Sequence, residues 1–139
     1  MGAGIAGRYV EFGASVNPKT IGDGKWHHVA GTFDGKQMNL YLDGKQIGSK
    51  AIEGKLNNQS TQPMKIGSYG GEPFHGDLNN IRLYRSGLSK IQMKRIADGD
   101  QQVAKDTLVG SWKKDDDVDL KIEQPIKQIA HHRIAKFLL

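Results

Sequence analysis

The side chains that could do chemistry in this chain are its carboxylates and a pair of adjacent histidines. Hydrolysis of a glycosidic bond needs two placed carboxyl groups, one acting as the acid and the other as base or nucleophile. Glu11, Glu53, Glu72 and Glu123 stand far apart in the sequence, and three of them fall in segments expected to be loops or tail. Cysteine is absent, which excludes disulfides, thiolate metal sites and cysteine nucleophiles. The sequence therefore predicts that this chain is not an enzyme.

His27 and His28 could suggest metal binding, but their spacing argues against it. They are direct neighbours in a segment that reads as a strand, and neighbouring side chains of a strand point to opposite faces. Two such imidazoles cannot chelate one ion together from a regular strand. We expect one ring to be packed or hydrogen-bonded inside the protein and the other to lie on the outer or ligand face.

A set of polar and aromatic residues falls on one face of two expected strands. Asn39 and Tyr41 alternate with apolar neighbours along residues 37–43, and Arg82 and Tyr84 alternate along residues 78–84. Sugar recognition uses an aromatic face together with planar polar groups, so these four residues are the predicted ligand-binding residues. Two alternatives stay open. The face could be ordinary solvent-exposed surface, or a ligand could bind at the rim loops 14–25 and 69–75, the second of which carries Tyr69 and Phe74.

The elements that must position these residues are short alternating strands. The sequence predicts strands at 8–12, 26–33, 37–43, 45–49, 63–68 and 78–84. The strands at 26–33 and 37–43 should form an antiparallel hairpin that turns at Asp34-Gly35, a dipeptide suited to tight turns. Val29, Leu40 and Leu42 should be buried, and Trp26 should be a substantial packing residue. Residues 89–97 read as a short helix, with a capping box formed by Ser89 and Gln92 and a hydrophobic staple formed by Leu88 and Met93.

Two blocks of sequence carry a resemblance to a known family. Residues 26–48 read WHHVAGTFDGKQMNLYLDGKQIG, and residues 66–93 contain an IG strand, then FHGDLNNIRLY, then a helix that opens with LS. This is similar to the LamG-like jelly-roll modules of the concanavalin A-like lectin and glucanase superfamily. The resemblance implies an all-β fold, an antiparallel jelly-roll β-sandwich with a short C-terminal helix. Family members have further strands before residue 8, so the domain is expected to be incomplete at its N-terminus and the chain a fragment.

The resemblance also bears on catalysis and on calcium. Glucanases of the superfamily display a Glu-x-Asp-x-x-Glu pattern on one strand, and this chain has no such triplet. Many relatives hold one Ca²⁺ at the rim of the sandwich with hard oxygen ligands. Asp77 and Asn79 match the place where such residues can lie, so they are the predicted calcium ligands. The expectation is therefore either no cofactor or calcium. The alternative is that Asp77 and its neighbours simply begin a strand.

Composition places this chain among soluble domains without a nucleic-acid footprint. The 139 residues include 18 glycines and carry a net charge of +5 at pH 7, with 25% charged and 37% hydrophobic residues. Basic residues are scattered, whereas nucleic-acid binding needs a stripe or patch of Lys and Arg. No run approaches the length of a membrane-spanning helix, and no signal peptide is visible at Met1. We therefore expect no nucleic-acid partner and no membrane insertion.

The predicted organisation is a LamG-like domain at residues 1–99, followed by a linker or the start of a further segment at residues 100–139. Residues 108–112 read LVGSW and resemble the opening strand of a LamG-like module; they could begin a second repeat or fill a vacancy in the first. The predicted function is non-catalytic recognition of extracellular polysaccharide or glycoprotein, within a larger secreted or cell-envelope protein. The alternatives are a structural or protein-adhesion module, or a targeting domain attached to a glycosidase or sulfatase.

Overall fold

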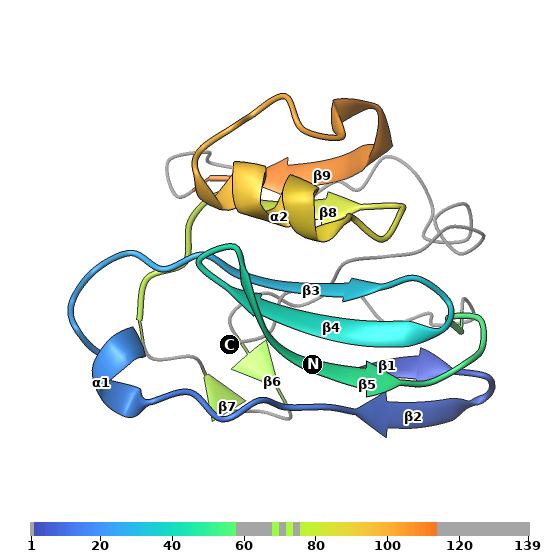
Figure 1. The fold of residues 1–139 in the computed structure, drawn as a ribbon. Helices are drawn as coiled ribbons and strands as arrows, with labels where there is room; N and C mark the ends of the chain where they lie inside the picture. Colours follow the sequence, from blue (N-terminus) through green and yellow to red (C-terminus); the bar gives the residue numbers. More distant parts are fainter. Residues whose placement is uncertain (1, 58–67, 70–71, 74–75, 114–139) are drawn as a thin grey trace.

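The computed structural model describes all residues except 1, 58–67, 70–71, 74–75 and 114–139 (Figure 1). The described residues form short antiparallel strands, two short α-helices and one 3-10 turn. In chain order these are β1 (Gly2–Ile5), β2 (Arg8–Glu11), α1 (Pro18–Ile21), β3 (Val29–Phe33), β4 (Gln37–Leu42), β5 (Lys45–Ala51), β6 (Ser68–Tyr69), β7 (Glu72–Pro73), β8 (Ile81–Tyr84), α2 (Lys90–Ala97), η1 (Lys105–Thr107) and β9 (Leu108–Trp112). The all-β antiparallel fold with a short helix is confirmed, and it is that of a jelly-roll β-sandwich.

The centre of the fold is the three-stranded sheet β3-β4-β5. β3 and β4 form the predicted hairpin, with Val29 opposite Leu42 and Phe33 opposite Met38. The hairpin turns at Asp34-Gly35, where the Asp34 carboxylate accepts from the backbone N–H groups of Lys36 and Gln37, both at 2.8 Å. This side chain supplies the hydrogen bonds that the tight turn leaves open, which explains why an acidic residue precedes the glycine.

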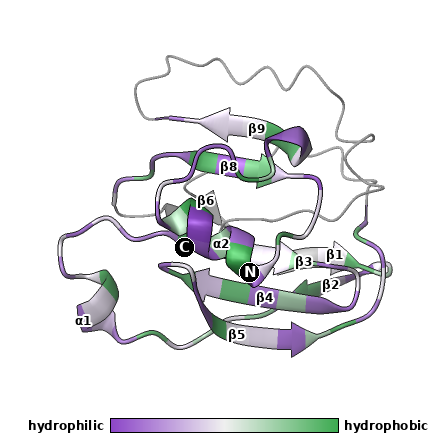
Figure 2. Cartoon of the chain, turned by 45° about the horizontal axis from the view of Figure 1, so that its top comes forward, coloured by the Kyte–Doolittle hydropathy of each residue, from purple (hydrophilic) through white to green (hydrophobic). Residues whose placement is uncertain are grey.

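Both faces of this sheet are covered, which alternation alone does not reveal. One face packs on a cluster of Ile5, Val10, Phe33 and Met38 beside the β1-β2 hairpin. The other face packs on a cluster of Ala30, Tyr41, Tyr84, Leu88 and Met93, to which β8 and α2 contribute. In Figure 1 the central sheet accordingly lies between β1-β2 and the layer of β8, β9 and α2. Figure 2 shows hydrophobic and hydrophilic residues interleaved along β4. Leu40 and Leu42 are buried as predicted, whereas Val29 is half-buried.

Helix α2 forms as its flanking residues predict. Ser89 is the N-cap, and the reciprocal contacts of the capping box with Gln92 are both present. Leu88 and Met93 are buried at 5% and 2% exposure, so the apolar pair holds the start of the helix against the core. The helix also packs on the turn between β4 and β5, where a β-carbon on Gly44 would lie 2.9 Å from Cα of Lys94. A glycine at this turn therefore lets the helix approach the sheet.

The structure changes several of the predicted boundaries. The strand expected at 26–33 begins only at Val29, and the strand expected at 78–84 begins at Ile81. Residues 2–5, which precede the first predicted strand, form β1, which pairs with β2 and bonds to residues 55–57. Asn17-Pro18, expected in a loop, starts the single helical turn α1. Of the strand predicted at 63–68, only Ser68 is described, in β6, and the part of the predicted segment 100–139 that follows residue 113 lies outside the described residues.

The segment after α2 folds onto the module. β9, the LVGSW segment, pairs antiparallel with β8, with Arg82 opposite Ser111. Val103 is 4% exposed, and Leu108 packs against the cluster that contains Tyr84 and Leu88. β9 therefore occupies a place beside β8, and the division of the chain at residue 99 stays a prediction. Within the described part of the chain, no helix is long and apolar enough to cross a membrane.

Candidate functional site

The four predicted ligand-binding residues come together, but inside the protein. Tyr41 and Tyr84 are each 2% exposed and belong to one core cluster, while Arg82 is 8% exposed and Asn39 is half-buried. The expectation that they share an open face is wrong, because β8 and α2 cover that face of β4. Burial also raises the pKa of Tyr41 above its usual value of 10.0. Their role in ligand binding stays a prediction, and Tyr41 and Tyr84 cannot stack on a sugar where they lie.

A row of polar side chains crosses the central sheet beside this cluster. The Gln46 amide donates to Asn39 Oδ1 at 3.2 Å, and the Asn39 amide donates to Thr32 Oγ1 at 3.5 Å. Thr32, which is 3% exposed, also hydrogen-bonds to Tyr41. These contacts satisfy polar groups that would otherwise be costly to bury. Asn39 is therefore held by its neighbours in the sheet rather than presented to a ligand.

Trp26 differs most from its predicted role. It was expected to pack in the core, yet it is 65% exposed. The residue lies in the segment 22–28, here called the Trp26 loop, which precedes β3 and has no strand pairing of its own. Large apolar surface left in water is unfavourable, and an exposed tryptophan is a characteristic binding residue of interfaces. Trp26 is therefore the main candidate contact residue among the described residues.

The Trp26 loop is held in place by the side chain that follows the tryptophan. His27 Nδ1 lies 2.9 Å from Asp43 Oδ2, and His27 Nε2 lies 3.0 Å from Asp23 Oδ1. We call this set of three residues the histidine clamp. It joins the start of the Trp26 loop to the turn between β4 and β5. Asp43 also accepts from the backbone N–H of His28 at 2.9 Å, and Asp23 accepts from that of Lys25 at 2.9 Å.

The charges of the histidine clamp support one another. The hydrogen bond to Asp43, followed by that to Asp23, raises the pKa of His27 above 6.5. The backbone N–H of Lys25 and then His27 lower the pKa of Asp23 below 3.8. Burial alone would raise the pKa of Asp43, but hydrogen bonds from His27 and from the His28 backbone lower it overall. The arrangement favours an imidazolium that donates from both nitrogens, which leaves neither nitrogen free to act as a general base.

His28, which also precedes β3, has a different environment from His27. Its imidazole is partly enclosed, and this desolvation lowers its pKa below 6.5, while Asp43 acts to raise it and Arg82 to lower it. The two rings therefore differ in their partners and in the direction of their pKa shifts. Within the part of the chain that the structure describes, no group of three His, Asp or Glu side chains could hold a metal ion.

The predicted calcium ligands lie in the segment before β8. Asp77 and Asn79 are both exposed, and Asn79 Oδ1 accepts from the backbone N–H of Asn80 at 2.8 Å. Calcium takes six to eight oxygen ligands, and this pair supplies one carboxylate and one amide that is already engaged. The described residues around them do not complete such a set, so calcium binding stays a prediction and no role for the ion is derived.

The sequence did not predict the histidine clamp, because nothing in the spacing of Asp23, His27 and Asp43 indicates that they are in contact. Asp23 and Asp43 each precede a glycine and read simply as turn residues. Asp43 has a positive φ of 50°, and this conformation of the turn brings its carboxylate to His27 and His28. The Asp-Gly dipeptide was the available signal, but it predicts the turn and not the contact.

The comparisons with known proteins agree with this fold. Residues 4–93 match the family described as the concanavalin A-like lectin/glucanases superfamily, of laminin G type. Mouse Pappalysin-1 is 30% identical over 80 residues, and zebrafish (Danio rerio) Adhesion G-protein coupled receptor V1 is 31% identical over 87 residues. These matches cover 54% and 60% of this chain but only 5% and 1% of the relatives, so the chain spans a small part of their length.

One solved structure was also found, an S-layer domain-containing protein from Clostridium thermocellum. It is 22% identical, with a TM-score of 0.49, and the match covers 65% of this chain and 45% of that one. This likeness is too weak to carry an argument about function. The family match spans the β3-β4 hairpin, the Trp26 loop, β8 and the start of α2. The chain therefore belongs to the concanavalin A-like lectin/glucanases superfamily, as a laminin G-like module.

Proposed function

We propose that this chain is a non-catalytic recognition module that binds extracellular polysaccharide or glycoprotein through the Trp26 loop. The observation that carries the proposal is the exposure of Trp26, 65%, on a loop fixed by the histidine clamp. A flat aromatic ring offers a stacking surface for the apolar face of a sugar, and it also offers contact area to a protein.

The rigidity of the loop supports binding rather than chance exposure. His27 contacts Asp23 within the loop and Asp43 in the turn between β4 and β5, and Asp43 also accepts from the backbone N–H of His28. A ligand that contacts Trp26 therefore meets a side chain whose neighbouring backbone is already ordered. Binding to an ordered surface costs less conformational entropy than binding to a mobile one. The rim loop 14–25, the alternative predicted from sequence, runs directly into this segment.

The family and the relatives support a role as one part of a larger protein outside the cell. The two relatives are far longer than the matched segment, and one of them is named an adhesion receptor. That name favours protein adhesion as a second candidate function. A targeting domain attached to a glycosidase or sulfatase is the third. All three place the module in a secreted or cell-envelope protein, and all three leave catalysis to other parts.

A glycan array probed with the full chain separates these candidates. We expect retention of polymeric glycans by the wild-type chain, and loss of that retention in Trp26→Ala. Tyr9→Ala is a matched control, because Tyr9 is an aromatic residue on β2 with a comparable exposure of 57%. If no glycan is retained but a protein partner is held through Trp26, the adhesion function replaces the sugar-binding one. If neither depends on Trp26, the proposed site is wrong.

A further inference from the structure

The histidine clamp closes a short ring of chain that carries Trp26. His27 Nε2 lies 3.0 Å from Asp23 Oδ1, and this contact spans four positions, so that it encloses Gly24, Lys25 and Trp26. Gly24 has a positive φ of 78°, which turns the backbone sharply inside the ring. The exposed indole therefore stands on a segment whose two ends are joined through the imidazole.

The two contacts of His27 together require a charged imidazole. Nδ1 lies 2.9 Å from Asp43 Oδ2 and Nε2 lies 3.0 Å from Asp23 Oδ1, so each ring nitrogen faces a carboxylate oxygen. An ionised carboxylate only accepts hydrogen bonds, and a neutral imidazole has a single N–H to donate. The imidazolium alone satisfies both contacts. A neutral His27 keeps one of them, and at the other a nitrogen lone pair faces the carboxylate.

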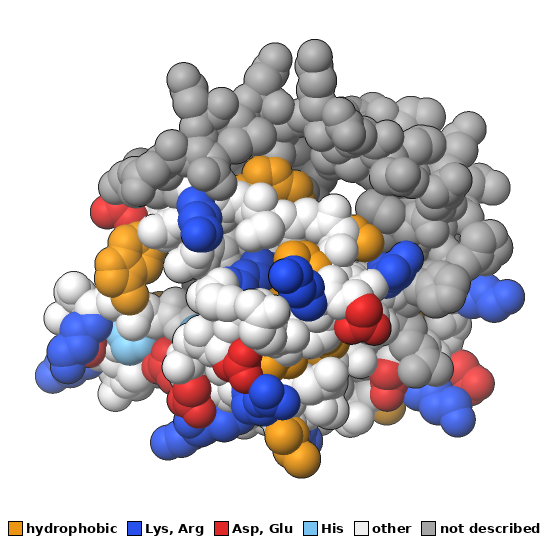
Figure 3. All heavy atoms as spheres, turned by 90° about the horizontal axis from the view of Figure 1, so that it is seen from above, with side chains coloured by type: hydrophobic (Ala, Val, Ile, Leu, Met, Phe, Trp, Pro, Cys, Tyr) orange, Lys and Arg blue, Asp and Glu red, His pale blue; other side chains and the backbone are white. Residues whose placement is uncertain are grey.

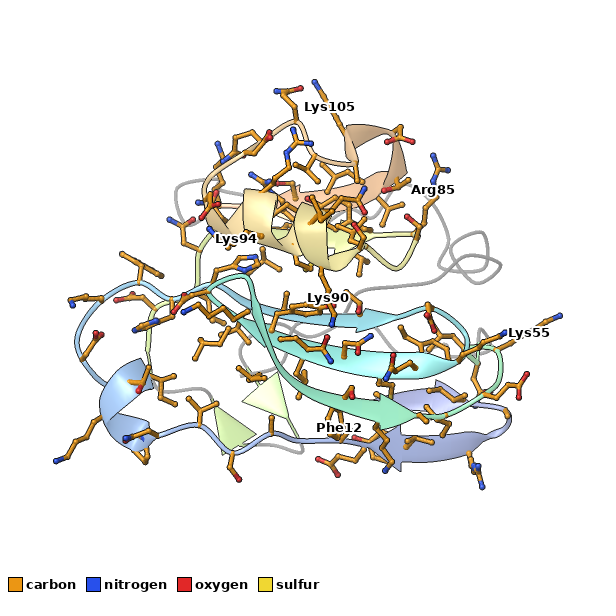
Figure 4. All side chains as sticks on the ribbon, in the orientation of Figure 1. Phe12, Lys55, Arg85, Lys90, Lys94 and Lys105 are labelled. Atoms are coloured by element: carbon orange, nitrogen blue, oxygen red, sulfur yellow. The ribbon has the colours of Figure 1, made fainter. Side chains whose placement is uncertain are left out.

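The contact with Asp43 is the one that a neutral imidazole keeps, because Asp43 belongs to the better anchored part of the clamp. It lies in the turn between β4 and β5, on which α2 packs: a β-carbon on Gly44 would lie 2.9 Å from Cα of Lys94. Figure 4 shows Lys94 above this turn, and its ammonium pairs with Asp98 of the same segment. Asp23 lies in the Trp26 loop itself, outside the strands. Loss of the proton therefore opens the ring at Asp23.

The other charged groups near the clamp do not replace the imidazolium. Lys25 Nζ lies 3.5 Å from Asp23 Oδ2, but its side chain is exposed and it is itself part of the enclosed ring. His28 faces Asp43 on one side and Arg82 of β8 on the other, and burial, the largest influence, lowers its pKa below 6.5. The closure of the ring therefore depends on a single titrating group.

We propose that His27 is a proton switch for the binding site at the Trp26 loop: its imidazolium closes the ring at Asp23 and holds Trp26 in the position that binds, and loss of the proton opens the ring and weakens binding. This inference rests on the proposed function and names the regulation of its site. The side chain of His27 is 16% exposed, so the ring is held by the protein and still reaches the solvent with which it exchanges protons. In the view from above, histidine atoms lie at the surface beside acidic, basic and hydrophobic side chains (Figure 3).

The direction of the switch follows from the hydrogen bonds of the clamp. The bond to Asp43, followed by that to Asp23, raises the pKa of His27 above its usual value of 6.5. The pKa values of both aspartates are lowered below 3.8, so the two carboxylates stay ionised while the histidine titrates. The ring is therefore closed at mildly acidic pH and opens as pH rises through the raised pKa of His27.

The first test probes the glycan array with the full chain and two variants at two pH values. Measurements at about pH 6 and about pH 9 lie between the usual titrations of the carboxyl groups, about 4, and of lysine, about 10.4. In His27→Gln the side chain has no proton to lose in this range, and it presents one donor nitrogen where the imidazolium presents two. His28→Gln is the matched control, because it is the same substitution at the neighbouring residue.

We expect wild-type and His28→Gln to bind the retained glycans roughly fivefold more weakly at the higher pH, the factor that corresponds to an ion pair accessible to solvent. His27→Gln should bind at both pH values as the wild type does at the higher one. An equal fall in His27→Gln would overturn the proposal. Binding by the wild type that does not change with pH would overturn this inference and leave the proposed function intact. Retention of no glycan at either pH would contradict the proposed function itself.

Time-resolved fluorescence anisotropy gives a second test that needs no ligand. The chain has two tryptophans, so Trp112→Phe leaves Trp26 as the single reporter of motion in the loop. At about pH 6 its anisotropy should decay with the tumbling of the whole molecule, and at about pH 9 a faster component, in the nanosecond range of loop motions, should appear. Absence of the faster component at both pH values, or its presence at both, would overturn the proposal.

Asp23→Asn separates the switch from a merely structural role of the contact. The amide of this variant can accept from the backbone N–H of Lys25 and donate to the Nε2 of a neutral His27, so the ring should stay closed at both pH values. The faster anisotropy component should therefore be absent from Asp23→Asn at about pH 9, where the wild-type loop is open. Its presence there, as in the wild type, would overturn the assignment of the Asp23 contact as the one that the proton controls.

Discussion

Truncation of Trp26 should weaken ligand binding far more than it weakens the fold. A fully buried tryptophan replaced by alanine costs about 3–5 kcal/mol of stability. Trp26 is 65% exposed, so only about a third of its surface is packed against the protein. Trp26→Ala should therefore lower the free energy of unfolding by about 1–2 kcal/mol. If the ring is an anchor for the ligand, its removal should cost at least about 2 kcal/mol of binding free energy, or roughly thirtyfold in affinity.

The two quantities need separate assays on the same variants. Urea denaturation followed by circular dichroism gives the free energy of unfolding, and titration with the glycan retained on the array gives the affinity. Tyr9→Ala is the control, since Tyr9 is 57% exposed and lies on β2, away from the Trp26 loop. It should lose a comparable amount of stability and none of the affinity.

Two results would refute this reasoning. A loss of stability near the value for a fully buried tryptophan would show that Trp26 packs against the protein in solution. An affinity unchanged from the wild type would show that the ring is exposed but does not contact the ligand. Either result would move the candidate site away from the Trp26 loop.

Three further predictions concern the core, the turn and the histidine clamp. Tyr84→Ala should cost about 3–5 kcal/mol in urea denaturation, because Tyr84 is 2% exposed and packs between β8 and the central sheet. Gly44→Ala should cost about 1–3 kcal/mol in the same assay, because Gly44 has a φ of 74° and an added β-carbon would meet helix α2. The clamp should be weakened at both ends of the pH range. The pKa of His27 is raised on folding, so its contribution to the free energy of unfolding is complete below pH 6.5 and is lost as pH rises through the folded pKa. The pKa values of Asp23 and Asp43 are lowered on folding, so their contributions to the free energy of unfolding are present above pH 3.8 and are lost as pH falls through the folded pKa values. Trp26 fluorescence, measured in a Trp112→Phe background, should therefore change above the raised pKa of His27, and His27→Gln should abolish that change; a pH-independent signal in the His27-containing protein would contradict the clamp.

The sequence by itself determined the local elements of this protein. The Asp34-Gly35 turn, the β3-β4 register and the buried Leu40 and Leu42 follow from alternation and turn chemistry, which depend on neighbouring residues. The capping box of α2 follows from Ser89 and Gln92 for the same reason. The residues of these elements also identified the family, because the order and spacing of the two motifs can be read from the sequence alone.

Only the tertiary structure decided which faces are covered and which residues meet. Alternation places Tyr41 and Arg82 on the polar side of their strands, but it contains no information on the layer of β8 and α2 that packs on that side. Trp26 reads as a core residue by type, yet the segment before β3 leaves the sheet, and its ring stays in water. The histidine clamp joins His27 to Asp43, sixteen positions away, through a turn conformation. Burial and long-range contacts depend on how the elements pack. The candidate site at the Trp26 loop was therefore identified from the tertiary structure and not from the sequence motifs.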